Sequence, residues 1–355
     1  MIRTSRVARL VAAAFVLGGS MTVGGLAAAR TQAGTPTAVQ LPGETTPIEA
    51  APPPEPISLQ GERYVAMGSS FAAGPLLRPA KPGGAARCGR SMNNYPTLLA
   101  ERFGMILTDR SCSGATTNNV LGPWKELIPQ IDAVTPQTRL VTITIGGNDL
   151  SYVGNLFAAT CHYRNATAPA GERPRACHPV RVPQNVDYAR VELQMNEIIR
   201  RIRTIAPRAR IVLVQYLNPL PPPGQLCEAT PISPQNAAIV RTIGKRLAEI
   251  TDKVARERGV LVVEMNIASE THSPCDAEPW MIGSPAGYDG SLGLQWHLNL
   301  AGMRATARDI AWWLVNSGYE EINPPHYEDE AGKTEKGEKT EKAEKAEKAG
   351  QVPVS

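Results

Sequence analysis

The sequence predicts a three-layer α/β/α domain built on a mainly parallel sheet. Short apolar runs alternate with longer segments of helical periodicity through the middle of the 355-residue chain, which is the pattern of strands joined by helices. Several runs are apolar at nearly every position, as expected for strands that are covered on both faces. Hydrophobic residues make up 42% of the chain, which is enough for a large core without the apolarity of a membrane protein.

Four segments are predicted to be strands of this sheet. They are residues 62–68 (ERYVAMG), 140–145 (LVTITI), 211–216 (IVLVQY) and 260–263 (VLVV). The first ends at a glycine, and the second alternates apolar residues with threonine before a Gly-Gly pair. The last two are largely apolar runs of the kind found in buried parallel strands. A further strand is expected before the loop at 111–117.

Three segments have the periodicity of helices with a single buried face. In each of them apolar residues recur every three or four positions. The three stripes are Val191, Met195, Ile198, Ile202 and Ile205; Ile239, Ile243, Leu247, Ile250 and Val254; and Leu300, Met303, Ala307, Ile310 and Leu314. These helices are expected to cover the sheet.

Both ends of the chain are predicted to lie outside the folded domain, which is expected at 61–318. Residues 1–29 contain arginines, then an uncharged stretch, then three alanines, which is typical of a cleaved signal peptide. Several glycines make the alternative, an uncleaved membrane anchor, a poor bilayer span. Residues 30–60 are rich in proline and predict a disordered linker. Residues 319–355 predict a disordered charged tail, because Glu-Lys pairs recur there without large apolar residues.

The charge balance gives no reason to expect a nucleic-acid partner. The formal net charge is +4, and loss of the predicted leader with its arginines would lower it further. The sequence has no basic stripe either. The mature protein is expected to be secreted, to have no transmembrane helix and to be a monomer.

The six cysteines are predicted to form disulfides, because an exported protein folds in an oxidising compartment. Their number allows 15 pairings, and the spacing does not decide among them, although pairing in sequence order is favoured. A zinc site at Cys161-His162 and Cys177-His178 is the alternative, but adjacent ligands do not have the usual zinc spacing. No metal and no cofactor are therefore expected. The cysteines are Cys88, Cys112, Cys161, Cys177, Cys227 and Cys275.

The loops that follow the predicted strands carry reactive groups. Ser70 follows the first strand, Gly114 lies in the loop 111–117, and Asn148 follows Gly146-Gly147. The carboxyl ends of parallel strands meet at one edge of the sheet, where ligands bind. Each residue also has a plain structural interpretation, because serine and asparagine are common helix caps and glycine is common in turns.

A candidate base lies just before the last predicted helix. Of the histidines at 162, 178, 272, 297 and 326, only His297 combines a position after a strand with a helix start. The positive end of the helix dipole disfavours an imidazolium there. His297 is therefore expected to be neutral at pH 7.

The four loop segments that carry Ser70, Gly114, Asn148 and His297 together resemble the GDSL, or SGNH, hydrolase family, most closely its secreted actinobacterial-type lipases and esterases. The resemblance covers residues 62–315 and implies a flavodoxin-like, five-stranded sheet. It implies that Ser70 is the nucleophile and His297 the base, with an oxyanion hole formed by Ser70, Gly114 and Asn148. It also implies disulfides 88–112, 161–177 and 227–275.

Two positions depart from the family pattern. Ser69 replaces the aspartate that precedes the nucleophile, and Leu294 replaces the aspartate expected three residues before the histidine. We expect the Leu294 carbonyl to orient His297, which would give a Ser-His dyad. Asp289 is the second candidate for this role, although Tyr288-Asp289-Gly290 also has the composition of a turn.

The resemblance implies a serine esterase or lipase that cleaves carboxylic esters through an acyl-enzyme, and the expected substrate is a small-molecule or lipid ester. Aromatic residues are only 5% of the chain, which is few for a sugar-stacking surface and favours lipid acyl esters. A carbohydrate or cell-wall acetylesterase is the alternative within the same chemistry. A catalytically inactive secreted binding protein is the alternative from another class, suggested by the two missing aspartates.

Overall fold

The computed structural model describes residues 55–324. The predicted signal peptide, most of the predicted linker and most of the predicted tail lie outside these residues, so they stay predictions.

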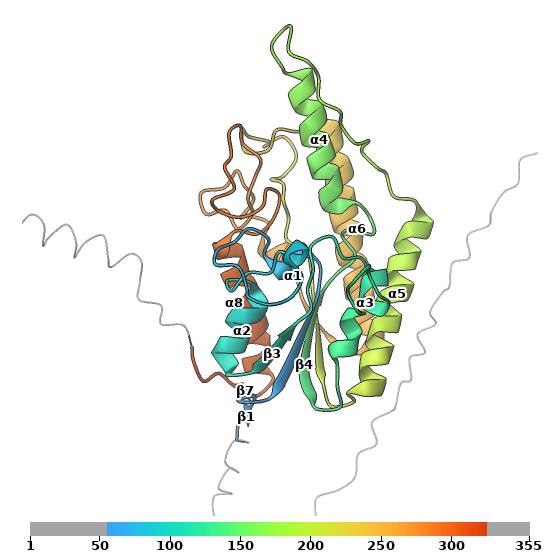
Figure 1. The fold of residues 1–355 in the computed structure, drawn as a ribbon, viewed down its shortest axis with the longest axis vertical. Coiled ribbons are helices and arrows are strands. Elements are labelled where there is room, and N and C mark those ends of the chain that lie inside the picture. Colours follow the sequence, from blue (N-terminus) through green and yellow to red (C-terminus); the bar gives the residue numbers. More distant parts are fainter. Residues whose placement is uncertain (1–54, 325–355) are drawn as a thin grey trace, which may run out of the picture. The chain divides into compact units, whose positions relative to one another are not determined.

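A parallel sheet of five strands forms the centre of the protein, in the order β3-β2-β4-β5-β6 (Figure 1). The strands are β2 (Arg63–Gly68), β3 (Ile106–Asp109), β4 (Thr138–Thr144), β5 (Arg210–Val214) and β6 (Leu261–Val263). All four neighbouring pairs are parallel. The sheet confirms the predicted fold class. Because β2 lies between β3 and β4, the strand order reverses there and creates the switch point at which such sheets bind ligands.

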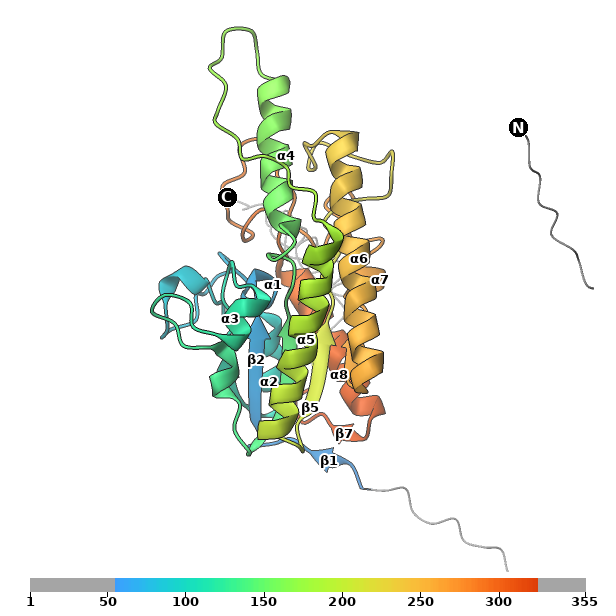
Figure 2. The ribbon, with the colours of Figure 1, turned by 90° about the vertical axis from the view of Figure 1, so that its right-hand side faces the viewer.

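Helices cover both faces of this sheet and complete three layers. Figures 1 and 2 show α2 (Tyr95–Phe103) and α8 (Leu300–Asn316) on one face. On the other face lie α3 (Thr117–Leu121), α5 (Asn185–Ile205) and α6 (Pro234–Arg258). The predicted stripes on α5, α6 and α8 are mostly buried in the core, as their periodicity requires. None of the helices in 55–324 is long and apolar enough to span a bilayer.

Three shorter or projecting helices belong to the carboxyl edge of the sheet. They are α1 (Ser70–Ala73), directly after β2, α4 (Tyr152–Ala166), after β4, and α7 (Met265–Ala268), after β6. Figures 1 and 2 show α4 extending beyond the sheet beside α6, so that it borders the space above α1. The loops at this edge are therefore bordered on one side by α4.

Secondary structure continues past both predicted domain boundaries, 61 and 318. The two-residue strand β1 (Ile57–Ser58) pairs in parallel with β7 (Tyr319–Glu320). Beyond β7, the Asn323 side chain donates to the Glu101 carbonyl of α2. These contacts join segments that are far apart in sequence, and strands of two residues leave no periodic pattern from which the pairing could be predicted.

The structure contains three disulfides: Cys88–Cys112, Cys161–Cys177 and Cys227–Cys275. They are the pairs that the family resemblance implies. Because the sulfurs of Cys161 and Cys177 are bonded to each other, they are not available to a zinc ion, and the alternative zinc site is wrong. No cluster of three or more potential metal ligands occurs within 55–324.

The end of β2 approaches β4 so closely that only glycine fits. Gly68 has φ +139°, and a Cβ there would lie 2.4 Å from the carbonyl oxygen of Thr144. That oxygen accepts a hydrogen bond from the Ser69 N–H at 2.9 Å. Gly68 therefore sets where the chain leaves the sheet and where Ser70 begins.

Gly68→Ala should lower the free energy of unfolding by about 3 kcal/mol or more, because it adds a backbone clash to a disfavoured φ. Gly61→Ala is the matched control, since Gly61 also has a positive φ of +73° but open space around its Cβ position. The control should cost only about 1–2 kcal/mol. Urea unfolding of the oxidised proteins measures both, and equal losses would contradict this account of Gly68.

Candidate active site

Ser70 lies at the start of α1, at the carboxyl edge of the sheet. Ser69 is the N-cap residue with extended backbone, and Gly74 ends the helix in the left-handed conformation. Ser70 is buried, with 5% of its surface exposed. The Ser69 side chain makes no capping hydrogen bond; its hydroxyl instead contacts the Tyr216 hydroxyl at 2.7 Å.

The loop before α8 brings His297 into hydrogen-bond contact with Ser70. The distance from His297 Nε2 to Ser70 Oγ is 2.8 Å, and Nδ1 lies 2.8 Å from the carbonyl oxygen of Gln295. A carbonyl oxygen can only accept, so Nδ1 carries the proton and Nε2 presents a lone pair. The Ser70 hydroxyl therefore donates to Nε2, which is the polarity needed to remove its proton.

The residue that orients His297 differs from both sequence predictions. The prediction for Leu294 was wrong, because its carbonyl accepts the His297 backbone N–H at 3.2 Å and not the ring. Asp289 is exposed, and its carboxylate accepts the backbone N–H of Ser291 at 2.9 Å, so it acts as a turn residue. The group that accepts the His297 Nδ1 proton is the backbone carbonyl of Gln295. Because every residue has such a carbonyl, the pattern of side chains in the sequence could not predict this contact.

Trp296 fixes the same loop from inside the protein. Its side chain is fully buried, and its indole N–H donates to the Thr160 hydroxyl of α4 at 3.2 Å. The backbone has φ +61° at this residue. Two backbone hydrogen bonds join this loop to Ile282: the Trp296 N–H donates to the Ile282 carbonyl at 2.9 Å, and the Ile282 N–H donates to the His297 carbonyl at 2.7 Å. The position of the imidazole is therefore set by packing as well as by hydrogen bonds.

Burial keeps the His297 imidazole neutral. Desolvation lowers its pKa from 6.5 to about 4, while the hydrogen bond to the Gln295 carbonyl opposes this shift. Phe71 and Phe157 lie beside the ring, with centroid distances of 5.4 and 6.5 Å. The predicted neutral state is present, but its main cause is burial and not the helix dipole that we expected.

Two backbone N–H groups at this edge are free to bind a ligand. Within residues 55–324, neither Ser70 nor Gly114 uses its N–H in a hydrogen bond. Gly114 has φ +84°, and a Cβ there would lie 3.2 Å from the Trp124 ring. The loop is held next to the serine turn, because the Cys112 N–H donates to the Gly68 carbonyl at 3.0 Å.

Asn148 is joined to the Gly114 loop. Its side-chain Nδ2 donates to the Ala115 carbonyl at 2.8 Å, which leaves one of its two N–H groups for another acceptor. The neighbouring Asp149 accepts the Thr117 N–H at 3.1 Å and the Thr117 hydroxyl at 2.5 Å. Burial raises the pKa of Asp149, and the Thr117 hydrogen bonds oppose that shift. The loops after β3 and β4 are therefore one connected unit.

Sequence reasoning missed a glutamine beneath the serine turn. The Gln130 amide accepts the Gly68 N–H at 2.7 Å and donates to the Gly68 carbonyl at 3.0 Å. It thus pairs with Gly68 as another strand would. Gln130 comes from a short 3₁₀ segment (Gln130–Ala133) before β4, and nothing in its local sequence indicates this contact. Tyr216 could have been noticed, because it ends a predicted strand at the active edge.

The predicted residues thus come from neighbouring loops at one edge of the sheet, with Ser70 and His297 in direct contact. A buried hydroxyl that donates to a neutral imidazole, beside unpaired N–H donors, is an arrangement suited to nucleophilic attack on a carbonyl.

Known proteins share both the sequence pattern and the fold. The GDSL-like Lipase/Acylhydrolase family matches residues 66–305. Lipase 2 of Streptomyces coelicolor is 29% identical over 229 residues, which is 62% of this chain and 77% of that protein. A lipase of Streptomyces rimosus is 27% identical over 63% of this chain and 77% of its own length. Phospholipase A1 from Streptomyces albidoflavus NA297 has the same fold, with a TM-score of 0.56 and 21% identity over 73% of this chain and 99% of its own.

The free energy of unfolding should depend on pH in a way that reflects the lowered pKa of His297. The unfolded histidine takes up a proton near its ordinary pKa of 6.5, whereas the folded one does so only near 4. The stabilising effect of the neutral, buried ring is therefore complete above pH 6.5 and is lost as pH falls towards 4. Between pH 7.5 and 4.5, wild type should lose about 2 kcal/mol more unfolding free energy than His297→Asn, measured in urea. Equal losses in the two proteins would mean that the histidine has an ordinary pKa.

Proposed function

The chain belongs to the GDSL-like lipase/acylhydrolase family and is a carboxylic ester hydrolase, and we propose that it cleaves its ester through a Ser70–His297 dyad. The observation that carries this proposal is the 2.8 Å contact between His297 Nε2 and Ser70 Oγ, with the opposite ring nitrogen bonded to the Gln295 carbonyl. The carbonyl takes the orienting role that an aspartate has in a triad.

In the proposed first step, Ser70 Oγ attacks the ester carbonyl carbon while its proton moves to His297 Nε2. The tetrahedral intermediate collapses, the bond to the leaving alkoxide breaks, and His297 returns the proton to that oxygen. The product of this half-reaction is an alcohol and an acyl-enzyme on Ser70. A water molecule, deprotonated by His297, then attacks the acyl carbonyl and releases the acid with Ser70 restored.

The proposed oxyanion hole consists of the Ser70 and Gly114 backbone N–H groups and the Asn148 side chain. Support comes from the two N–H groups that have no hydrogen bond within 55–324. The Asn148 amide is held by Ala115 and keeps one N–H unused. Donors that are fixed before reaction stabilise the developing negative charge without reorganisation.

Lipid acyl esters are the proposed substrates. The ring of His297 is flanked by Phe71 and by Phe157, and 38% of the Phe157 surface is exposed. An apolar wall beside the base suits an acyl chain better than a sugar. The related Streptomyces proteins at 29% and 27% identity are named lipases.

We further propose that the protein is exported. Residues 1–29 would be the cleaved signal peptide, 30–60 a linker and 319–355 a charged tail, apart from the parts that pair as β1 and β7. The three disulfides support this, because such bonds persist in oxidising compartments. A related structure is that of an extracellular lipase from Streptomyces rimosus.

Ser70→Ala should abolish p-nitrophenyl ester hydrolysis, because the nucleophile is gone. Asn148→Ala should retain activity lowered by about 10²–10³, because one oxyanion donor is removed. Ser317→Ala is the control, since this exposed hydroxyl at the end of α8 bonds only to the Trp313 carbonyl; it should match wild type.

Fluorophosphonate labelling gives a second measurement. If Ser70→Ala were labelled as strongly as wild type, Ser70 would not be the nucleophile. If folded wild type were not labelled at all, the result would favour an inactive binding protein.

The chain-length profile tests the lipid assignment. Relative kcat/KM on p-nitrophenyl acetate, octanoate and palmitate should rise from the two-carbon ester to the longer ones, because each added methylene can be buried beside Phe157. Phe157→Ser should flatten this rise without abolishing acetate hydrolysis. A sharp maximum at acetate would overturn the lipid proposal and support the acetylesterase alternative.

A further inference from the structure

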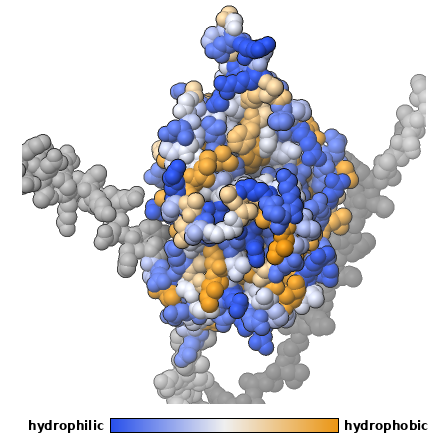
Figure 3. Space-filling model, viewed as in Figure 1, coloured by the Kyte–Doolittle hydropathy of each residue, from blue (hydrophilic) through white to orange (hydrophobic). Residues whose placement is uncertain are grey.

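Two leucines at the carboxyl edge of the sheet are exposed although their neighbours are buried. Leu76 is 58% exposed and Leu292 is 62% exposed. Leu76 lies just after α1, which begins with Ser70, and Leu292 lies in the loop that leads to His297. Figure 3 shows hydrophobic side chains gathering among the loops above the sheet, next to α4. Exposed leucines on both segments that carry the dyad call for an explanation.

The two leucine-bearing segments form one continuous surface. The Leu294 N–H donates to the Pro75 carbonyl at 3.0 Å. A Cβ at Gly290 would lie 3.8 Å from the Leu76 side chain, which places that side chain against the loop of Leu292. The buried Leu77 packs below, beside Gly293.

Both leucines are held rigidly in their exposed positions. Leu76 has φ +64°, a left-handed conformation that is disfavoured for a bulky, non-glycine residue. In the other loop, the Tyr288 hydroxyl accepts the Leu292 N–H at 3.2 Å and donates to the Gly293 carbonyl at 2.8 Å. Backbone strain that directs an apolar side chain to the surface does not help the fold, and such strain often marks a functional surface.

Cationic groups without carboxylate partners lie next to these leucines. A hollow of about 590 Å³ is lined by Leu76, Leu77, Arg78, Lys81 and Arg90 among other residues, none of which is acidic. Lys81 pairs with Asp109 at 2.9 Å. Within 55–324, neither Arg78 nor Arg90 has a carboxylate oxygen within 4.0 Å.

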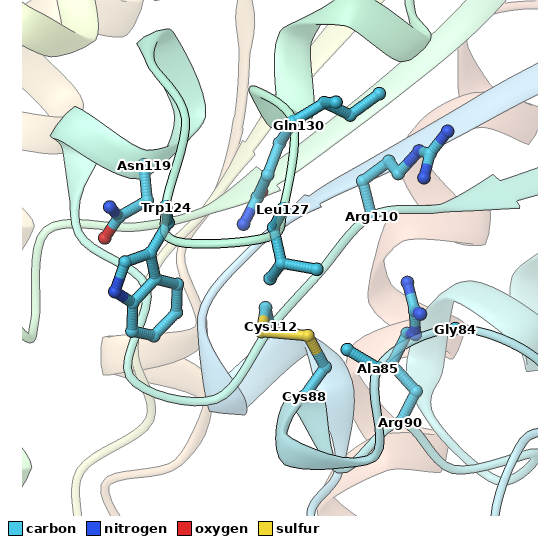
Figure 4. A pocket seen from close by; sticks show the side chains of 11 residues that line it. Gly84, Ala85, Cys88, Arg90, Arg110, Cys112, Asn119, Trp124, Leu127 and Gln130 are labelled. Carbon is cyan, nitrogen blue, oxygen red and sulfur yellow. A yellow bond between two sulfur atoms is a disulfide. The ribbon is translucent and has the colours of Figure 1, made fainter.

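The basic surface continues into an adjoining cavity of about 80 Å³, which shares Arg90 with the hollow. Figure 4 shows Arg90 and Arg110 on one side of this cavity and Trp124 on the other, with the Cys88–Cys112 disulfide between them. Arg110 is exposed and also has no carboxylate partner within 55–324. This local positive charge contrasts with a net charge of only +4 for the whole chain.

We propose that Leu76, Leu292, Arg78, Arg90 and Arg110 form a docking surface for anionic lipid aggregates. The arginines attract the anionic headgroups, and the two leucines insert beneath them into the acyl region. Because both leucines lie on the segments that carry Ser70 and His297, docking places the active edge against the lipid surface. The proposal deepens, and rests on, the proposed function as a lipid ester hydrolase.

Vesicle co-sedimentation of the full, oxidised chain with Ser70→Ala tests the docking surface without hydrolysis. The vesicles contain phosphatidylcholine alone or with 30% phosphatidylglycerol. Binding should be at least tenfold tighter to the anionic vesicles. On these, Arg78→Gln should weaken binding about fivefold, and Leu76→Ser with Leu292→Ser about tenfold or more. Every variant carries the same chain ends, so any contribution from residues outside 55–324 cancels.

The chain offers matched controls. Leu193→Ser changes an equally exposed leucine, at 71%, on α5, and Arg208→Gln changes an arginine just before β5, at the opposite edge of the sheet. Neither should alter vesicle binding. Asp289→Asn should tighten binding up to about fivefold, because it removes a negative charge next to Gly290 while the amide oxygen can still cap the turn.

Equal binding to both kinds of vesicle, or equal losses from the controls and the docking variants, would overturn the docking surface. Hydrolysis of soluble p-nitrophenyl butyrate, measured with Ser70 intact, separates this result from failure of the proposed function. Absence of hydrolysis together with selective anionic binding would refute the dyad and keep the docking surface. Hydrolysis without selective binding would keep the esterase and refute the surface.

Discussion

The hydrogen bond between His297 Nδ1 and the Gln295 carbonyl is the constraint on which the arrangement of the site depends. It fixes the tautomer, so that Nε2 faces Ser70 as an acceptor. A backbone carbonyl carries no net charge and cannot titrate, so it orients the ring without the strong stabilisation of imidazolium that a carboxylate would add. Burial then lowers the pKa to about 4 without an opposing ion pair. The result is an imidazole that is neutral over a wide pH range.

This geometry requires a loop that cannot move. Trp296 has left-handed backbone and a fully buried indole, and it is tied to α4 through Thr160. On the serine side, Gly68 is pressed against Thr144 and paired with Gln130. Ser70 and His297 are therefore positioned by the core on both sides, and contacts within the protein hold each loop in place.

The same edge also shows how a departure from the family pattern is accommodated. Ser69 stands where an aspartate is expected, and its hydroxyl reaches the Tyr216 hydroxyl in the core. A carboxylate in this fully buried position would need a charged or strongly donating partner. Serine fills it with a neutral hydrogen bond. The outer side of the edge is different. Within 55–324 its arginines Arg78, Arg90 and Arg110 have no carboxylate partner, and this contrast underlies the inferred lipid surface.

The three layers and the loops that carry reactive groups could be predicted from the amino-acid sequence, because burial imposes periodicity on strands and helices. The family resemblance singled out Ser70, His297, Gly114 and Asn148, because the four motifs occur in the order that the family has. The folded loop shows that Gln295, and neither Leu294 nor Asp289, orients the histidine. The sequence could not predict this, because every residue has a backbone carbonyl and the direction of that carbonyl depends on the fold of the loop. The contacts of Gln130 with Gly68 and of β1 with β7 could not be predicted from the sequence either. They join segments that are far apart in the chain, and the local sequence of one segment does not indicate the other.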